Sequence, residues 1–395
     1  MLRASLGISI GWIGISMVAD GLPALLLPHL LLADGGTDAT TLGLITLVAI
    51  AVAAMLQPIA GRWSDRIGRF PIIGAGTAMA VGGLALLLGP GTAVAGTVLA
   101  LAGVSVAQAG QQALLPDRIV PSWRGRAGGL KSAFDVAGAF AGFVILAALL
   151  GAGEPALAAI VLGVALIAGF GVTRLLVRHR APLARPIEAG DRLEPGASTA
   201  LVKLVAARFL FLLGIYAVGR FLLLFVAERF DLGADAAGGE AGTALALLAV
   251  ITVAASIPSG WLADRIGRRP LMMIGAALGA AGIGLLPAAG SLDGVLGFGA
   301  LMALGSAAFG SASWAMLGDL TASSDAGRLM GLANFGTAGA AAGAGAFGFL
   351  IDAAGYGPAF LLAAACSLAG GVLAWTLVDG SRPAEVLIGS TEGAH

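Results

Sequence analysis

Two charged side chains stand deep inside long apolar stretches of the chain, where a charge is costly and rarely incidental. Asp20 lies in the first stretch and Arg220 in the seventh. At about 1.5 Å of rise per residue, each would lie roughly 20–26 Å along its helix. A carboxylate and a guanidinium at this depth could grip a polar solute, or exchange partners while a proton is carried. They could equally form a permanent ion pair that allows both charges to be buried.

The fourth apolar stretch carries three amide side chains. Gln108 and Gln112 are four residues apart, and Gln111 stands beside Gln112. Each amide offers a hydrogen-bond donor and an acceptor, which suits a hydroxyl-rich ligand. The alternative is that these amides join neighbouring helices to one another.

Three further side chains are candidates for the same site. Tyr216 stands one helical turn before the arginine of the seventh stretch and shares its face. Trp314 could stack on a sugar ring, or could anchor the tenth stretch at the membrane interface. Asp135 could be a second proton site, or could bond Arg126 or Lys131 near the membrane surface.

The elements that would position these side chains are membrane-spanning helices. Hydrophobic residues make up 58% of the chain and charged residues 11%, whereas a soluble domain carries about 25% charged residues. A bilayer core requires about 20 apolar residues per helix, and only helices satisfy their own backbone groups in lipid, so the predicted fold is all-α. The twelve predicted spans are 6–32, 41–62, 71–90, 92–115, 128–150, 155–177, 203–227, 241–262, 270–289, 292–317, 328–351 and 357–378.

Composition also narrows the classes of function. The formal net charge is zero, so a nucleic-acid partner is not expected. The three histidines are scattered and the single cysteine, Cys366, lies in an apolar run, so we predict no metal site, no cofactor and no internal disulfide. No Ser-His pair, soluble catalytic domain or G-x-x-x-x-G-K-[ST] motif stands in the chain, so an enzyme is not expected.

Two motifs recur at about half the chain length. Residues 61–69 (GRWSDRIGR) return 199 residues later as residues 260–268 (GWLADRIGR). A second pattern returns at an offset of 202 residues, and its charged members are Asp117, Arg126, Asp319 and Arg328. Matched motifs in matched order predict two parallel halves, related by an axis along the membrane normal.

The division between the halves is predicted at residues 178–199, a polar stretch with three prolines. We therefore expect a six-helix half at 1–177, a linker at 178–199 and a second six-helix half at 200–395. Lysine and arginine gather on the side of the spans that holds this linker, while acidic residues gather on the other side. Because basic loops stay in the cytoplasm, we expect both termini inside and a multi-pass protein of the plasma (cytoplasmic) membrane.

Twelve segments in two halves, with G-x-x-x-D-R-x-G-R after the second and eighth segments, resemble the major facilitator superfamily. The resemblance implies a monomeric secondary transporter that works by alternating access, with the first and seventh segments facing each other across a central cavity. It assigns the gating motif to Gly61, Asp65, Arg66, Gly68, Arg69, Gly260, Asp264, Arg265, Gly267 and Arg268.

The resemblance also implies a role for this motif. Its glycines would permit a tight turn, and its aspartate would meet arginines and a helix N-terminus across the interface between the halves. Such a latch would hold one state closed; the alternative is a loop that only sets topology. The first copy departs from the family pattern, because Phe70 follows Arg69 where a basic residue is common, whereas the second copy keeps Arg269.

Finer family features favour one kind of cargo. Proton-driven drug exporters usually carry an arginine midway along the fourth segment and often a Gly-Pro pair in the fifth; 92–115 holds no basic residue and 128–150 no proline. Residues 114–131 are similar to a bacterial branch related to disaccharide carriers. We therefore expect import of a small polar solute, sugar-like, by H⁺ or Na⁺ symport or by facilitated diffusion. The alternative is a proton-coupled exporter of drugs or metabolites.

Overall fold

The computed structural model describes residues 2–177, 195–320 and 326–377, of which 116, 121–126, 132, 195–198, 318–320 and 326–334 are described by their backbone only. Within these ranges every regular element is helical, and twelve helical spans are long and apolar enough to cross a membrane. Each of the twelve predicted segments overlaps one of these spans, and the predicted all-α fold is confirmed. The predicted linker falls mostly on 178–194, outside the described residues, while its last five residues belong to a helix that begins at Pro195.

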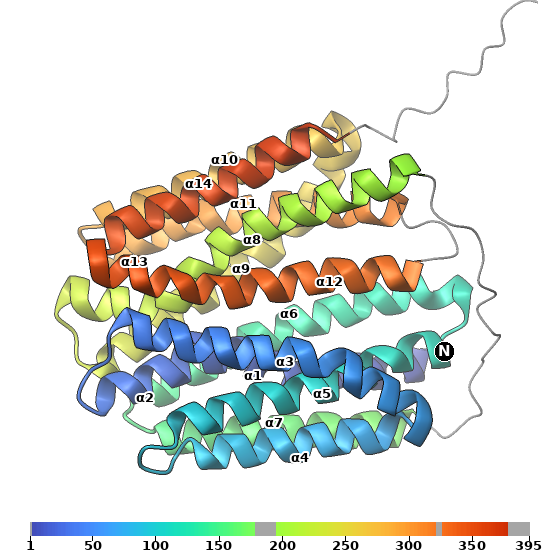
Figure 1. Cartoon of the computed structure of the whole chain (residues 1–395), viewed down its shortest axis with the longest axis horizontal. Helices are drawn as coiled ribbons and strands as arrows, with labels where there is room; N and C mark the ends of the chain where they lie inside the picture. Colours follow the sequence, from blue (N-terminus) through green and yellow to red (C-terminus); the bar gives the residue numbers. More distant parts are fainter. Residues whose placement is uncertain (1, 178–194, 321–325, 378–395) are drawn as a thin grey trace, which may run out of the picture.

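The spans follow one another as an up-and-down bundle (Figure 1). In the first half the helices are α1 (Leu2–Gly21), continued by a π-helical turn (Leu22–Leu26) and α2 (Leu27–Ala33), then α3 (Ala39–Ile67), α4 (Arg69–Leu86), α5 (Ala93–Arg118), α6 (Pro121–Gly151) and α7 (Pro155–Leu176). In the second half they are α8 (Pro195–Phe230), α9 (Ala234–Ile266), α10 (Arg268–Leu285) with a 3₁₀ turn (Leu286–Ala288), α11 (Leu292–Leu320), α12 (Ala326–Gly343) with a 3₁₀ turn (Ala344–Ala346), α13 (Phe347–Ala354) and α14 (Tyr356–Trp375).

Glycine contacts show that the sequence repeat is also a packing repeat. In the first half α4 packs on α5, and a Cβ added at Gly83 would collide with Ala100. In the second half α10 packs on α11 in the same way, and a Cβ added at Gly282 would lie 2.6 Å from the backbone nitrogen of Met302. Gly282 is 199 residues after Gly83, and Met302 is 202 residues after Ala100, so these contacts follow the two offsets of the sequence motifs. The same pair of helices is therefore packed backbone to backbone in each half.

The two ends of the bundle differ in charge. We call one the basic end, which holds the helix ends with Arg66, Arg69, Arg118, Arg174, Arg265 and Arg268. We call the other the acidic end, which holds Asp34, Asp38, Glu154, Asp231, Asp235 and Asp352. In Figure 1 the acidic end lies on the left and the basic end, with the N-terminus, on the right.

The halves meet closely at the acidic end. A Cβ added at Gly43 in α3 would collide with the carbonyl of Gly345, and one added at Gly345 would collide with the carbonyl of Gly43. A Cβ added at Gly242 in α9 would lie 2.7 Å from Cα of Ala147 in α6. Toward the basic end α3 and α12 diverge, as Figure 1 shows. Among the described residues, backbone contacts between the halves are thus found at the acidic end.

Candidate functional site

A cavity of about 440 Å³ lies between the two halves. Its wall takes residues from α1, α3, α5 and α6 of the first half and from α8, α9, α11 and α12 of the second. Most of the wall is aliphatic or aromatic, with Ile50, Leu101, Val104, Phe143, Leu245 and Met302 among its members. Its polar members are Asp20, Gln57, Ser105, Gln108, Tyr216, Arg220, Thr252 and Ser306. The structure thus brings four of the sequence-predicted candidates into one cavity: Asp20, Gln108, Tyr216 and Arg220.

Asp20 is positioned by a local irregularity of its helix. Two residues after it the α-helical pattern gives way to the π-helical turn Leu22–Leu26, which contains Pro23. Proline removes a backbone donor from the helix, and single π turns occur often at functional sites. The side chain of Asp20 is half-buried, and within the described part of the chain its carboxylate has no hydrogen-bond or ion-pair partner. It therefore faces the cavity as an unpaired acceptor.

Arg220 is the cation of the same cavity, and only 6% of its surface is exposed. One of its terminal nitrogens, Nη2, lies 3.4 Å from the carbonyl oxygen of Ala341, at the outer limit of a hydrogen bond. Its Nε and Nη1 atoms are buried and have no hydrogen-bond partner among the residues that the structure describes. Among the described residues no oxygen of Asp20 lies within the 4.0 Å of an ion pair with Arg220. The two charges share a cavity without being joined.

The three glutamine side chains of α5 lie in different environments. Gln108 lines the cavity, whereas Gln111 and Gln112 are not in its wall. Gln111 is 1% exposed, and its Nε2 donates to the carbonyl of Ile8 at 2.7 Å and to Oγ1 of Thr173 at 3.1 Å. Gln111 thus joins α1, α5 and α7, which agrees with the alternative prediction that these amides join neighbouring helices. On α5 the expectation of three cavity amides is corrected to one, because Gln111 faces α1 and α7, and Gln112 lies one helical turn beyond Gln108 toward the basic end.

Two other candidates also lie outside the cavity wall. Asp135 accepts a hydrogen bond from the Ser16 hydroxyl and lies 2.6 Å from Nζ of Lys131, which itself sits 3.7 Å from the ring centre of Trp12. Asp135 therefore bonds Lys131, as its second interpretation held, and through Ser16 it also links α6 to α1. Trp314 is 45% exposed.

Trp314 has a partner that the sequence did not single out. The guanidinium carbon of Arg208 lies 4.2 Å from its ring centre, and Nη1 of Arg208 donates to the Ser313 hydroxyl. A cation over an aromatic face is favourable when desolvated. Sequence reasoning missed Arg208 because it stands near the start of an apolar stretch, where a basic residue is ordinary.

Sequence reasoning also missed Gln57, Ser105, Thr252 and Ser306, which belong to the polar part of the wall. Gln57 is the one amide in the predicted second span and precedes Pro58, which lies inside α3. That combination of an amide and a helix-interior proline was the available signal. Ser306 gave none, since serine is common in membrane helices. In the described residues no group of three His, Cys, Asp or Glu side chains could hold a metal ion.

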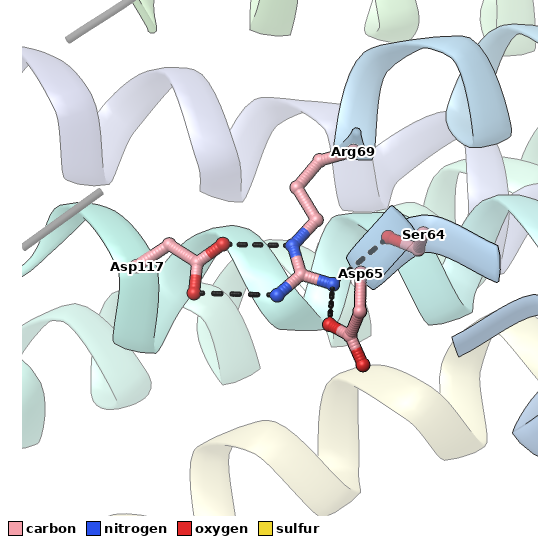
Figure 2. Close-up of polar contacts among 4 residues, drawn as sticks. All are labelled: Ser64, Asp65, Arg69 and Asp117. Atoms are coloured by element: carbon pink, nitrogen blue, oxygen red, sulfur yellow. Dashed lines mark hydrogen bonds and ion pairs between the residues drawn. The ribbon is translucent and has the colours of Figure 1, made fainter. Parts of the chain in front are cut away.

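The first copy of the loop motif forms a cluster within its own half (Figure 2). Nε of Arg69 lies 2.7 Å from Oδ2 of Asp117, and Nη2 lies 3.4 Å from Oδ1. Nη1 of Arg69 donates to the Ser64 hydroxyl at 3.0 Å and to Asp65. The cluster joins the end of α3, the start of α4 and the end of α5, and it also links the two repeated motifs of the sequence.

In this state Asp65 is bound to Arg69 of the same loop, and 64% of its side chain is exposed. The expected latch across the interface would close one state only, so its role stays a prediction. Gly61 and Gly260 lie inside α3 and α9. Only Gly68 and Gly267 make the turn, with φ of 99° and 94°, in the region that favours glycine. Among the described residues Asp65 has no partner across the interface in this state.

The second copy of the motif makes different contacts. Nη1 of Arg268 donates to the carbonyl of Ala315 at 2.9 Å, and the guanidinium of Arg265 sits 3.5 Å from the ring centre of Trp261. Asp264 has no partner within the described part of the chain. The side chains of Arg126, Asp319 and Arg328, which belong to the second repeat, lie outside the described residues, as does any contact of theirs.

A polar contact adds to the closure of the acidic end. The carboxylate of Asp352, at the end of α13, accepts from the backbone N–H of Ala39 at 3.0 Å and from that of Thr40 at 2.7 Å. These are the first two N–H groups of α3, which have no partner within the helix. Nδ1 of His29 lies 3.1 Å from the carbonyl oxygen of Ala234, at the start of α9. A carboxylate of the second half thus caps a helix of the first.

Comparison with known proteins agrees with this architecture. A model of the Major Facilitator Superfamily matches residues 10–239 and 204–395. Among solved structures, a POT family transporter in complex with 5-aminolevulinic acid is similar with a TM-score of 0.76 at 14% identity, over 94% of this chain and 95% of that one. A peptide transporter POT mutant in complex with sulfate has a TM-score of 0.75 at 14% identity, over 94% of this chain and 93% of that one.

A bacterial homolog of the human lysosomal transporter Spinster, in an inward-facing and occupied conformation, has a TM-score of 0.66 at 15% identity, over 94% of this chain and 93% of that one. No curated protein matches the chain significantly. At such identities the solved structures show the fold alone, whereas the family match spans nearly the whole sequence. The chain is a multi-pass membrane protein and a transporter, and it belongs to the major facilitator superfamily.

Proposed function

We propose that this transporter moves a small polar solute by alternating access, with the cavity between its halves as the binding site. The observation that carries the proposal is the pair of unjoined charges, Asp20 and Arg220, in the wall of that cavity. Charges inside a membrane bundle mark solute or ion pathways far more often than they stabilise it. The cavity lies between the halves, as expected of transporters built from two repeats.

Alternating access requires two states, and the contacts define one of them. The acidic end is closed by backbone contacts at Gly43 and Gly345 and by the Asp352 cap, while α3 and α12 diverge at the basic end. If the basic end faces the cytoplasm, as the positive-inside rule favours, this state is open to the inside. We propose that the halves 1–177 and 200–395 move as bodies about the linker 178–199. In the other state the loop motif would come within reach of the opposite half.

Coupling to an ion would act through Asp20. Its carboxylate is half-buried in the cavity wall and has no protein partner among the described residues, so a proton or Na⁺ can neutralise it there. Tyr216, Gln57 and Gln108 would supply neutral hydrogen bonds to the solute. Symport of H⁺ or Na⁺ is therefore the preferred mode for a solute without a cationic group, whereas a solute that brings its own ammonium to Asp20 would take the place of the ion and cross by facilitated diffusion.

Export of drugs or metabolites remains the second candidate. The largely aliphatic wall, with Phe143 and Met302 in it, would suit an apolar cargo. Against this, a buried unpaired cation and anion would both be left unsatisfied by an apolar molecule, at a cost of several kcal/mol.

The test is a ligand screen followed by transport. Thermal unfolding of the purified protein is measured with sugars, carboxylates, amino acids and cationic drugs at two pH values, since binding to the folded state raises the unfolding temperature. Ligands that stabilise are then tested for accumulation in proteoliposomes with and without an imposed proton or Na⁺ gradient. Gradient-driven accumulation of a polar solute supports the proposal. If only cationic drugs stabilise the protein and the protein extrudes them, the proposed uptake function is wrong and the protein is an exporter.

A further inference from the structure

The charges of the central cavity are arranged for a ligand that carries both signs. The wall has one acidic and one basic side chain, Asp20 from α1 and Arg220 from α8, so its formal charge is balanced. A direct ion pair would be the simplest way to hold both charges in a membrane bundle. None forms within 4.0 Å between these described residues, and neither has another charged partner there.

A second buried arginine on α8 shows how such a side chain is satisfied without a ligand. Arg208 and Arg220 are each 6% exposed. Arg208 donates to Ser313 and stacks on Trp314, so its charge has partners within the protein, and its Nε is its one buried atom without a hydrogen bond among the described residues. In the same part of the chain Arg220 has only the 3.4 Å contact to a carbonyl, and both its Nε and its Nη1 are unpartnered. The planar fork of a guanidinium matches a carboxylate with two parallel hydrogen bonds.

Asp20 requires a ligand group of the opposite charge. An ionised carboxylate only accepts hydrogen bonds, so it is matched by an ammonium or another strong donor. A neutral sugar could bond both side chains, but it would leave two opposite charges uncompensated in a low-dielectric site. A molecule with a carboxylate at one end and an ammonium at the other compensates both at once.

The rest of the wall and its volume set the remaining features. The surfaces between the polar groups are aliphatic, including Ile50, Leu101 and Leu245. The volume of about 440 Å³ lies toward the lower end of the range of about 300–1,000 Å³ for small-molecule sites. We infer that the transported solute is a zwitterion of amino-acid to dipeptide size with an apolar side chain, its carboxylate on Arg220 and its ammonium on Asp20. This inference rests on the proposed transport function.

The test uses matched ligands on the purified full-length protein. The probes are L-leucine and alanyl-leucine, the amide and the N-acetyl form of each, and maltose as the neutral sugar. We expect a zwitterion to bind, and its amide and N-acetyl forms to bind about 10- to 100-fold more weakly, the effect of losing one charge-assisted interaction. Maltose should neither bind nor compete. Binding is measured by titration calorimetry and by the shift of the unfolding temperature.

Variants assign the two ends of the ligand. Arg220→Gln should abolish the preference for leucine over leucinamide, and Asp20→Asn should abolish the preference over N-acetylleucine. Arg208→Gln is the matched control, since it removes an equally buried arginine from the same helix but outside the cavity, and the preferences should survive. If Arg220→Gln does not fold, Arg220→Lys keeps the charge but cannot donate in parallel, and it should weaken the carboxylate preference.

Three outcomes would overturn the inference. They are absence of binding by any zwitterion, equal binding of acid and amide, and the same loss of preference in Arg208→Gln as in Arg220→Gln. Binding and gradient-driven uptake of maltose without any zwitterion would refute the zwitterion and leave the transport function standing. Binding of a zwitterion with no uptake of any solute would instead contradict the transport function.

Discussion

Removal of the Asp352 carboxylate should open the acidic end of the bundle. Its two oxygens accept from the N–H groups of Ala39 and Thr40, so the second half holds the first turn of a helix in the first half. Asp352→Asn keeps one acceptor oxygen and the size of the side chain. The change therefore removes one of the two hydrogen bonds and the negative charge next to the helix N-terminus.

The magnitude follows from these two losses. A hydrogen bond to a charged group contributes about 1.5–3 kcal/mol, and a charge at a helix end about 0.3–1 kcal/mol. Asp352 is solvent-exposed, so screening lowers the sum below the roughly 1.8–4 kcal/mol that these two ranges give together. We expect about 1 kcal/mol, which shifts the ratio of closed to open forms at the acidic end about fivefold.

The assay is a distance measurement between spin labels at Asp34 in the first half and Asp293 in the second, both exposed near the acidic end. Asp352→Asn should increase the population with the longer distance. Asp38→Asn is the control, because Asp38 accepts from the N–H of Thr41, two residues into the same helix, and belongs to the same half. The hydroxyl and backbone N–H of Thr41 hold the pKa of Asp38 below its ordinary value, so the control also removes a charge at neutral pH. An unchanged distribution in Asp352→Asn, or an equal shift in the control, would refute the reasoning.

Three further outcomes are expected. For topology, a cysteine at Ser198 should resist an impermeant thiol reagent in intact cells while one at Asp34 reacts; the opposite pattern would invert the orientation. For the loop cluster, Asp117→Asn should lower the free energy of unfolding by about 1–2 kcal/mol, whereas Asp65→Asn, whose side chain is 64% exposed, should change unfolding little but reduce transport; equal unfolding losses would contradict this. For coupling, Asp20→Asn should abolish gradient-driven uptake and leave thermal unfolding nearly unchanged, because the carboxylate has no protein partner among the described residues; a strong loss of stability would show a structural charge.

The architecture could be predicted from the sequence because its signals are long and repeated. Each span is a run of about 20 apolar residues, and the two motifs fix the equivalence of the halves. Asp20 and Arg220 were predicted at a similar depth along their helices, and the structure places both in one cavity wall. A charged residue in the middle of a membrane span can be placed in this way because it is stable only where it faces the interior of the bundle or a cavity.

Side-chain direction could not be predicted in the same way. Gln108 and Gln111 differ by three residues, yet one faces the cavity and the other joins three helices. That difference depends on how α5 is rotated about its axis relative to its neighbours. The spacing of apolar residues does not predict this rotation when all sides of a helix are apolar. The partner of Asp65 was missed for another reason, since it depends on which end of the bundle is closed. The Asp352 cap joins residues more than 300 positions apart, and no local sequence pattern predicts such a contact.

The contact of Gly43 with Gly345 has a consequence for how this transporter can be arrested. Two main chains touch there without any side chain between them, so no rotamer can adjust to an added atom. One methyl group, as in Gly43→Ala, would act as a wedge at the end where the halves pivot together. Cross-linking between the opposite ends of the halves should then rise above the wild-type level, and wild-type levels would show that the backbones can yield. Such a variant would hold the protein in the complementary state and make that state accessible to structure determination.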